Sequence, residues 1–591
     1  MFSFFLLLYS SLFSFDNPNV IIIIVNNQGY GYLSCNGNPT LKTPNIDKLF
    51  HQSIRFTDYH VSPTCSPTRG ALISGHYSNR CGTWHTIKGR SMLFQGEITL
   101  GEVFQKNGYA TAMFGKWHLG DNYPFRPEDR GFSEVVRHGG GGIGQTPDFW
   151  DNAYFDDTYF HNGSLKSYEG FCTDVYFNEA ICFIRENIAT KKPFFVYLST
   201  NAPHSPFHCP EKYWKPYTKF SEGYGGDKLA IFYGMITNID ENIGKLGKCL
   251  IDLDIADNTI FIFTTDNGTA SGDEVYNAGM TGKKGSNKEG GHRVPLFIYW
   301  KDGNLFGGRE ITKLTAHIDI LPTLIELCGL EPIKNDYKLD GKSLVPLMKD
   351  LLVIWLSRTI ITDSKRVEDP VMWRNCSIMN DQWRLLDGRE LYDIRTDPAQ
   401  KNDLSKDYPK ILEKLRIDYE NWWADISPNF RKYARIIVGN PAENPSFLTA
   451  HDWLSGRRTP WHQGHIRSSI LSNGLWALKV ETQGEYKISL RRWPRETGAN
   501  SDAEIPTGKK VAGLSAYREK LGKAINIEKV GLMIGNYEKE INYTPNTQET
   551  TFTLNLLPGL YELHGYFILK GGKKWVVITY ILKKFSYNLP K

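Results

Sequence analysis

Short apolar runs alternate with amphipathic stretches between Asn19 and about Pro295. The runs are mostly apolar at successive positions, as is typical of strands buried on both faces, and they are "VIIIIV", "YATAMFG", "PFFVYLST", "TIFIFTTDNG" and "PLFIYW". The stretches between them repeat apolar residues at helical spacing, as in "TPNIDKLFHQS", "CTDVYFNEAICFIRENI" and "KLAIFYGMITNIDENIGKLGKCLIDL". This alternation predicts an α/β domain over residues 16–351, with a mostly parallel sheet flanked by helices.

The pattern changes twice in the second half of the chain. Between 352 and 430, the strand-like "WRLLDG" and "ELYDI" precede one amphipathic helix, "YPKILEKLRIDYENWWADI", so we expect a small α+β subdomain that closes the first unit. From 431 to 591, alternating strands are separated by Gly, Asn and Pro turns. These strands predict a separate β-rich, sandwich-like C-terminal domain.

Polar side chains follow three of the predicted parallel strands. Asn26 and Asn27 come after the first strand, the segment 201–204 follows "FFVYLST", and Asp266 and Asn267 follow "FIFTT". In open parallel sheets the binding site lies at the carboxyl ends of the strands. We therefore expect these side chains to meet in one site.

Composition limits the classes of partner and compartment. Lys and Arg number 69 against 64 Asp and Glu in 591 residues, so no nucleic-acid partner and no anionic membrane surface are expected. The apolar run at residues 1–15 has the length of a signal-peptide core and predicts a secreted or periplasmic protein without stable membrane insertion. It lacks a basic start and a clear cleavage site, so a buried strand or an uncleaved anchor remains the alternative. Nine cysteines leave at least one thiol unpaired.

One cysteine lies in a chemically distinctive stretch, "TCSPTRGALISGH" at residues 64–76. We expect a loop that becomes helical after Arg69, which places Cys65 near a helix N-terminus that favours anions. A thiol beside an arginine is a candidate nucleophile. The alternative, for the stretch taken alone, is a buried cysteine in a proline-containing turn.

The stretch Cys65-Ser66-Pro67-Thr68-Arg69, with "GALISG" after it, resembles the C-x-P-x-R signature of the type I sulfatases, the formylglycine-dependent, arylsulfatase-like branch of the alkaline-phosphatase-like superfamily. Further segments similar to motifs of this family occur in the family's order along the chain: "LKTPNIDKL", "GKWHLG", "NAPHSPF", "TTDNG", "GKKGSNKEGGHRVP" and "DGRELYDIRTDP". The resemblance implies a sulfuric ester hydrolase that acts on a sulfated small molecule or glycan. It also implies a maturation partner, the formylglycine-generating enzyme.

The resemblance assigns roles to the catalytic positions. Cys65 would become formylglycine, whose hydrate has one hydroxyl to attack sulfur and a second to expel sulfate. Arg69 would anchor the modified residue, and Lys116 and Lys284 would bind sulfate oxygens.

Two histidines complete the implied catalytic set. His118 would assist elimination from the second hydroxyl, and His204 would act as the general acid on the ester oxygen.

The implied metal site departs from the family pattern. Asp266 and Asn267 match the family's ligands for a divalent metal, expected to be Ca²⁺. The D-D-x-G motif of the family is replaced here by Asn26-Asn27-Gln28-Gly29, and Tyr32 stands where an aspartate is common. Because the charge of the ligand set falls from about −3 to −1, we predict weak calcium binding.

Two alternatives remain open at this stage. One is an inactive sulfatase-like protein that binds sulfated glycans, because its metal carboxylates are amides. The other is a phosphate or phosphonate ester hydrolase of the same superfamily. His292, in "EGGHRVP", stands where the family usually has an apolar residue, and no catalytic role follows from it.

Overall fold

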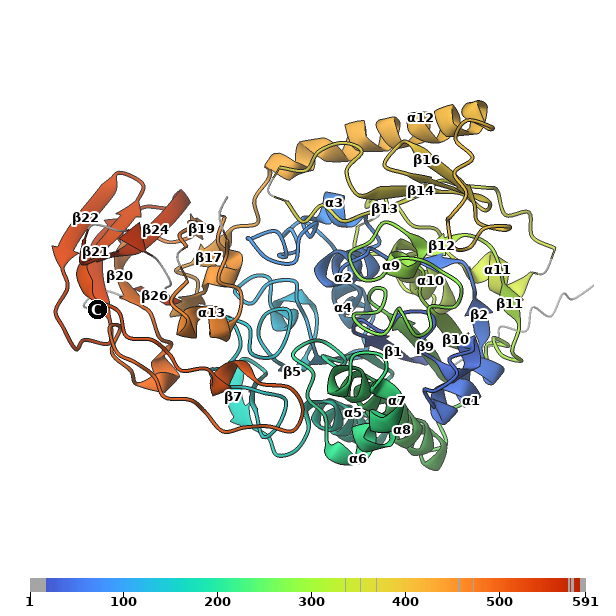
Figure 1. The fold of residues 1–591 in the computed structure, drawn as a ribbon, viewed down its shortest axis with the longest axis horizontal. Helices are drawn as coiled ribbons and strands as arrows, with labels where there is room; N and C mark the ends of the chain where they lie inside the picture. Colours follow the sequence, from blue (N-terminus) through green and yellow to red (C-terminus); the bar gives the residue numbers. More distant parts are fainter. Residues whose placement is uncertain are drawn as a thin grey trace, which may run out of the picture.

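The computed structural model describes residues 17–571, 574–575 and 579–584, except residues 335, 351, 368, 455–457 and 471. The predicted signal peptide at residues 1–15 lies outside the described residues. Figure 1 shows the α/β part of the chain on one side and the β-rich C-terminal part on the other. A small sheet and its long helix lie along one edge of the α/β part.

Ten strands of the described chain form the central sheet. Its middle, β9-β1-β8-β4-β5, is parallel, and the strands beyond both ends of this middle include antiparallel pairs. In spatial order the strands are β11 (Glu310–Ile311), β2 (Ile54–Phe56), β10 (Leu296–Tyr299), β9 (Thr259–Thr265), β1 (Asn19–Val25), β8 (Phe194–Ser199), β4 (Ala110–Gly115), β5 (Glu134–Arg137), β6 (Thr158–His161) and β7 (Ser164–Ser167).

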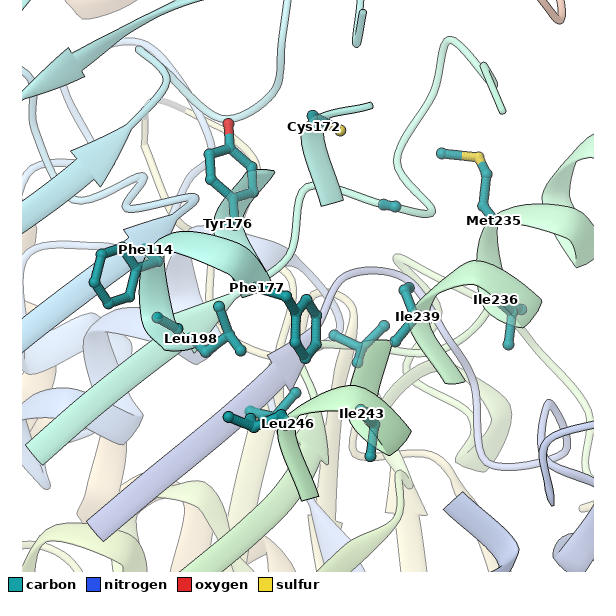
Figure 2. Close-up of a cluster of buried hydrophobic side chains, with 14 of the residues drawn as sticks. Phe114, Cys172, Tyr176, Phe177, Leu198, Met235, Ile236, Ile239, Ile243 and Leu246 are labelled. Atoms are coloured by element: carbon teal, nitrogen blue, oxygen red, sulfur yellow. The ribbon is translucent and has the colours of Figure 1, made fainter. Parts of the chain in front are cut away.

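Side chains of β1 alternate between two hydrophobic cores, one on each face of the sheet. Ile21 and Ile23 pack into the core that includes α5 (Cys172–Ala189) and α8 (Asp227–Asp252), part of which Figure 2 shows. Ile22 and Ile24 pack into the opposite core, which includes residues of α2 (Cys65–Ser74), α4 (Leu100–Lys106) and α10 (Ile320–Leu327). Every position of β1 is buried because both faces are covered, which explains its continuous apolar sequence.

Helix α2 begins earlier than the sequence predicted. We expected a loop up to Arg69, but the helix starts at Cys65 and includes Pro67. A proline in the first turn lacks only an N–H that has no partner within the helix there, so it is compatible with this start. The remaining helices are α1 (Pro44–Gln52), α3 (Ser78–Cys81), α6 (Glu211–Trp214), α7 (Thr218–Ser221), α9 (Glu289–His292), α11 (Val345–Lys349) and α13 (Gln463–Arg467).

The small subdomain is a four-stranded antiparallel sheet covered by α12 (Pro409–Ile426). Its strands are β13 (Ile360–Asp363), β14 (Cys376–Met379), β15 (Trp383–Leu386) and β16 (Glu390–Asp393). Buried polar contacts join it to the α/β part: Asn79 Nδ2 donates to Asp363 Oδ2 over 2.9 Å, and Arg384 Nε donates to Glu289 Oε1 over 2.8 Å. The two parts therefore share an interior.

The C-terminal part contains two mostly antiparallel sheets with a common apolar core. Trp476 and Trp493 are fully buried, whereas Trp461 is half-buried. The strands are β17 (Ile436–Val438), β18 (Ser446–Leu448), β19 (Trp476–Val480), β20 (Gly484–Arg491), β21 (Ile527–Ile534), β22 (Tyr537–Asn542), β23 (Thr550–Leu556), β24 (Gly559–Leu569), β25 (Lys574–Trp575) and β26 (Thr579–Lys584). The predicted fold class, a mostly parallel α/β sheet with an additional β-rich domain, is confirmed.

In the portion of the chain that the structure describes, no helix has both the length and the apolar character needed to cross a membrane.

Candidate active site

Three adjacent parallel strands end at one edge of the sheet and bring distant polar residues together. Asn26 and Asn27 follow β1, Asp266 and Asn267 follow β9, and Asn201 lies just beyond β8. The backbone N–H of Asn27 donates to Asp266 Oδ1 over 2.9 Å, and Asn26 Nδ2 donates to the Asn201 carbonyl over 3.2 Å. The carboxyl ends of these strands thus form one site, as the parallel arrangement predicts.

Helix α2 directs its first residue, Cys65, at this edge. The Cys65 thiol lies 3.6 Å from Asn26 Oδ1, 3.7 Å from Asn27 Oδ1 and 3.4 Å from Asn267 Oδ1. Lys284 Nζ lies 3.3 Å from the same sulfur and donates to Asn27 Oδ1 over 2.7 Å. Three amide oxygens and one ammonium group therefore surround the Cys65 sulfur.

Arg69 lies one turn further along α2, and its hydrogen bonds connect this helix to the ends of three strands. Its Nε and Nη2 donate to Asp266 Oδ2 over 3.1 and 2.9 Å, and its Nη1 donates to the Lys116 carbonyl and to the Ser199 hydroxyl. Both side chains of the Arg69–Asp266 pair are completely buried. Burial alone would raise the pKa of Asp266, but the charges of Arg69, Lys116 and Lys284 outweigh it and hold that pKa below its ordinary value.

Lys116 is a buried cation without a counterpart. Its side chain is fully buried, and its Nζ makes no hydrogen bond within the described chain. Burial is the main reason that its pKa falls to about 8, with the charge of Arg69 acting in the same direction. A buried ammonium group without an acceptor, close to a second lysine, is suited to bind an anion with several oxygens.

His118 and His204 each donate a hydrogen bond from one ring N–H to a backbone carbonyl. His118 Nε2 lies 2.8 Å from the Thr86 carbonyl, so it carries the proton, and its buried Nδ1 has no partner in the described part of the protein. His204 Nδ1 donates to the Ser205 carbonyl over 2.7 Å, which leaves Nε2 as its second nitrogen. Each histidine therefore has one ring nitrogen free to move a proton.

The pKa values of both histidines lie well below the ordinary value. Burial is the largest cause for each. The charge of Lys116 lowers both pKa values further, and Lys284 also lowers the pKa of His204. Both imidazoles are therefore neutral near pH 7 until an anion offsets the lysine charges.

The glycine-rich segment 137–152 contacts both histidines. A Cβ built on Gly141 would lie 2.3 Å from His118 Cε1, and one built on Gly142 would lie 3.0 Å from His204 Nδ1. The backbone N–H of Gly141 is held by Gln145 Oε1 at 2.8 Å. The close contact explains the glycine at position 141, because a side chain there would displace the His118 ring.

Residues of the C-terminal domain reach the rim of the site, which the sequence did not reveal. The His451 ring lies 5.8 Å from that of His118, and Thr146 N donates to the Trp461 carbonyl over 3.1 Å. Arg467 pairs with Asp151 at 2.6 Å. No local motif marks these residues, since they are more than 300 positions away from their partners.

The structure thus brings the ten predicted site residues to one region: Asn26, Asn27, Cys65, Arg69, Lys116, His118, His204, Asp266, Asn267 and Lys284.

The oxygen atoms around Cys65 are of the type that a hard divalent cation prefers, because they belong to amides and a carboxylate. They agree poorly in charge, since Asp266 is the single carboxylate among the four predicted ligands and is already paired with Arg69. This low charge is the basis of the prediction that such a cation would bind weakly.

Fold and site together define an α/β protein in which a buried cysteine lies among amide oxygens and next to a lysine at the carboxyl ends of the parallel strands. The chain belongs to the sulfatase family, whose model, described as "Sulfatase", matches residues 18–330, more than half of the chain. It is 31% identical over 359 residues to human N-acetylgalactosamine-6-sulfatase, with 56% of this chain and 66% of that protein covered. It is 28% identical over 369 residues to mouse arylsulfatase G, covering 55% of this chain and 67% of that protein. The chain therefore spans just under two thirds of the length of the human relative.

Solved structures match a larger share of this chain than the sequence relatives do. The crystal structure of Ps i-CgsB superposes with a TM-score of 0.62 at 27% identity and covers 70% of this chain and 94% of that one. Its complex with k-i-k-neocarrahexaose superposes with a TM-score of 0.61 at 25% identity, covering 71% and 95%. A phosphonate monoester hydrolase of Agrobacterium radiobacter, at 21% identity and a TM-score of 0.50, shares the fold.

Proposed function

We propose that the protein hydrolyses sulfate esters of carbohydrates or aryl compounds through a formylglycine formed from Cys65. The observation that carries this proposal is the environment of the Cys65 sulfur, which lies 3.3 Å from Lys284 Nζ in a site with a second, unpartnered lysine. Such a site favours an ester of a tetrahedral anion over a neutral ester. A sulfated glycan is the preferred substrate class, because the relatives include an N-acetylgalactosamine-6-sulfatase and a structure complexed with neocarrahexaose.

The first step would be transfer of the sulfuryl group to the modified residue. One hydroxyl of the formylglycine hydrate gives its proton to Asp266 and attacks sulfur, and the bond from sulfur to the alcohol oxygen breaks. Lys116 and Lys284 neutralise charge on the sulfate oxygens during this step. His204 gives a proton to the departing alcohol through Nε2, the nitrogen that is not held by the Ser205 carbonyl.

Substrate binding would itself prepare His204 for that role. Burial and, after it, the charges of Lys284 and Lys116 keep the pKa of His204 low, so its imidazole is neutral in the free site. A bound sulfate monoester brings a negative charge between the lysines and removes part of this effect. Substrate binding therefore shifts the pKa of His204 upward, towards the protonated form, although the effect of burial remains.

The second step would release sulfate without water attacking sulfur. His118 Nδ1, buried and without a partner in the described chain, accepts the proton of the remaining hydroxyl. The carbonyl of formylglycine re-forms as the bond between its carbon and the sulfate oxygen breaks. The aldehyde is then hydrated again for the next cycle.

Calcium is the proposed metal, held by Asn26, Asn27, Asp266 and Asn267. When bound, it would supply positive charge next to the sulfate oxygens. The low charge of this ligand set supports weak binding. The same observation favours a second candidate function, a sulfatase-like protein that binds sulfated glycans without hydrolysing them.

Export is proposed together with this activity. The apolar segment at residues 1–15 supports a secreted or periplasmic location, and sulfated glycans are extracellular polymers. N-terminal sequencing of the mature protein tests this point, because a retained Met1 in the cell interior would contradict it.

Mass spectrometry of the peptide that contains Cys65, combined with assays, tests the function. We expect an aldehyde in place of the thiol, and release of sulfate from a sulfated oligosaccharide that Cys65→Ala abolishes. The matched control, Cys182→Ala, changes an exposed cysteine and should retain full activity. An unmodified thiol and no sulfate release, with binding retained, would support the glycan-binding candidate. Faster cleavage of a phosphonate ester would support the phosphonate hydrolase of the same superfamily.

A further inference from the structure

A second cluster of ligand-type side chains lies outside the catalytic residues. His60 ends β3 (Tyr59–His60), and Glu289 and His292 are the first and last residues of α9. All three are buried, with exposed fractions of 1%, 0% and 0%, and one ligand atom of each lies within 4.8 Å of the others. The cluster therefore has the compactness of a metal site.

The hydrogen bonds of the two histidines determine where their protons are. His60 Nε2 lies 2.9 Å from Asp58 Oδ1, and His292 Nε2 lies 3.1 Å from the Asn287 carbonyl. A carboxylate and a carbonyl accept hydrogen bonds. Arg384 Nη2 also lies 3.4 Å from His60 Nε2, but it donates to Asp58 Oδ1 over the shorter distance of 2.7 Å. Both Nε2 atoms therefore carry protons. The lone pair of each neutral ring is then on Nδ1.

These two Nδ1 atoms face each other at 2.9 Å. Two lone pairs at this separation repel one another unless a positive particle lies between them. The particle is either one proton, which makes one ring an imidazolium, or a metal ion. The third member of the cluster distinguishes these cases.

Glu289 presents an oxygen that lacks a donor. Its Oε1 accepts from Arg384 Nε, whereas its Oε2 is buried and makes no hydrogen bond in the described chain. Arg293 Nη1 lies 3.7 Å from Oε2, which is an ion pair but too long for a hydrogen bond. A single proton shared by His60 and His292 leaves this oxygen without a partner, whereas a metal ion gives it one.

We propose that His60 Nδ1, His292 Nδ1 and Glu289 Oε2 bind a divalent transition-metal ion, with zinc as the best match. Two imidazoles and one carboxylate are ligands that zinc accepts. Tetrahedral bonds of about 2.05 Å place two nitrogens about 3.3 Å apart, so the rings need to separate by only a few tenths of an ångström. A water molecule fills the fourth position.

The surroundings resemble the outer shell of a metal site. Asp58 Oδ1 accepts a hydrogen bond from the Nε2–H of His60 and a second from Arg384 Nη2 over 2.7 Å. Ligating histidines commonly give their second N–H to a carboxylate or carbonyl in this way, which fixes the ring orientation. The donor set also differs from that of the catalytic site, where the predicted ligands are all oxygens.

The ion would fix two walls of the catalytic site to each other. β3 precedes the segment that leads to Cys65, and α9 follows the segment that carries Lys284. Arg384 extends the connection to β15 of the small subdomain. The proposed zinc is therefore structural, and its loss should affect the separation of Cys65 and Lys284.

Metal analysis of the full-length protein, refolded or expressed with zinc and then dialysed, tests the proposal. We expect about one zinc per chain in the wild type and at least a tenfold decrease in His292→Leu, which restores the apolar residue usual in the family. Asn267→Ala, which alters the catalytic site, should retain the zinc. Equal zinc in wild type and His292→Leu, or loss of zinc in Asn267→Ala alone, would overturn the proposal.

A measurement on the wild type keeps the test independent of variant folding. X-ray absorption of the zinc-loaded protein should show two imidazole nitrogens at about 2.0 Å. Zinc should also raise the midpoint of thermal unfolding of the wild type. A folded wild type that takes up less than about a tenth of an equivalent of zinc would mean that the histidines share a proton instead.

Discussion

Arg69 and Asp266 form a completely buried ion pair in which two guanidinium nitrogens donate to one carboxylate oxygen, at 3.1 and 2.9 Å. The pair joins the first turns of α2 to the end of β9, and through the Asn27 N–H to the end of β1. Since Cys65 lies one turn from Arg69, the position of the proposed nucleophile depends on this pair.

Removal of one partner should destabilise the fold. In Asp266→Ala the Arg69 charge stays buried without a counterion, and we expect the free energy of unfolding to fall by about 3–5 kcal/mol in urea denaturation. The control, Asp273→Ala, breaks an exposed pair with Lys283 and should cost less than about 1 kcal/mol. Equal losses in the two variants would contradict the proposed importance of the buried pair.

Restored carboxylates should tighten calcium binding. Asn27→Asp keeps an acceptor for Lys284 Nζ and Asn267 Nδ2 and adds a negative charge, so the dissociation constant measured by calorimetry should fall about tenfold or more. Asn26→Asp should be tolerated less well without metal, because it replaces a donor to the Asn201 carbonyl by an acceptor. The exposed Asn304→Asp supplies the same charge change as a control. Submicromolar calcium binding that is unchanged by all three substitutions would refute weak binding in the wild type.

Binding of inorganic sulfate should weaken as the pH rises through about 8. Burial lowers the pKa of Lys116 to about 8, so the ammonium form that binds the anion is present below this pH and is lost above it. We expect the dissociation constant to increase on the order of tenfold by about pH 9. Lys116→Arg, which keeps its charge throughout, should not show the change. An identical pH profile in both proteins would assign the effect to another group.

Gly141→Ala should reduce turnover more than stability. The new Cβ would lie 2.3 Å from His118 Cε1, so the ring must move. Displacement of a catalytic group by about 1 Å commonly costs on the order of 100-fold, and we expect a loss of this size in kcat. Gly96→Ala, where a Cβ meets nothing within 4 Å, is the matched control. A Gly141→Ala enzyme with wild-type kcat would show that the ring adapts without consequence.

The sequence predicted some of the strands and helices and misplaced the start of one helix. The strands β1, β8 and β9 and the helices α5 and α8 were predictable, because their apolar periods match burial on two faces or on one face. The start of α2 was predicted five residues too late, because the helix begins at Cys65 and accepts Pro67 in its first turn. The boundaries 351/352 and 430/431 remain predictions.

The sequence by itself determined the α/β alternation, the order of the motifs and the place where Asn26, Asn27, Asp266 and Asn267 meet, because parallel strands align their carboxyl ends. Only the tertiary structure decided that His60 faces His292, 232 positions away, and that Gly141 presses on His118. These contacts arise from side-chain packing between segments that are distant in sequence. No local periodicity encodes such packing, so it is visible only once the chain has folded.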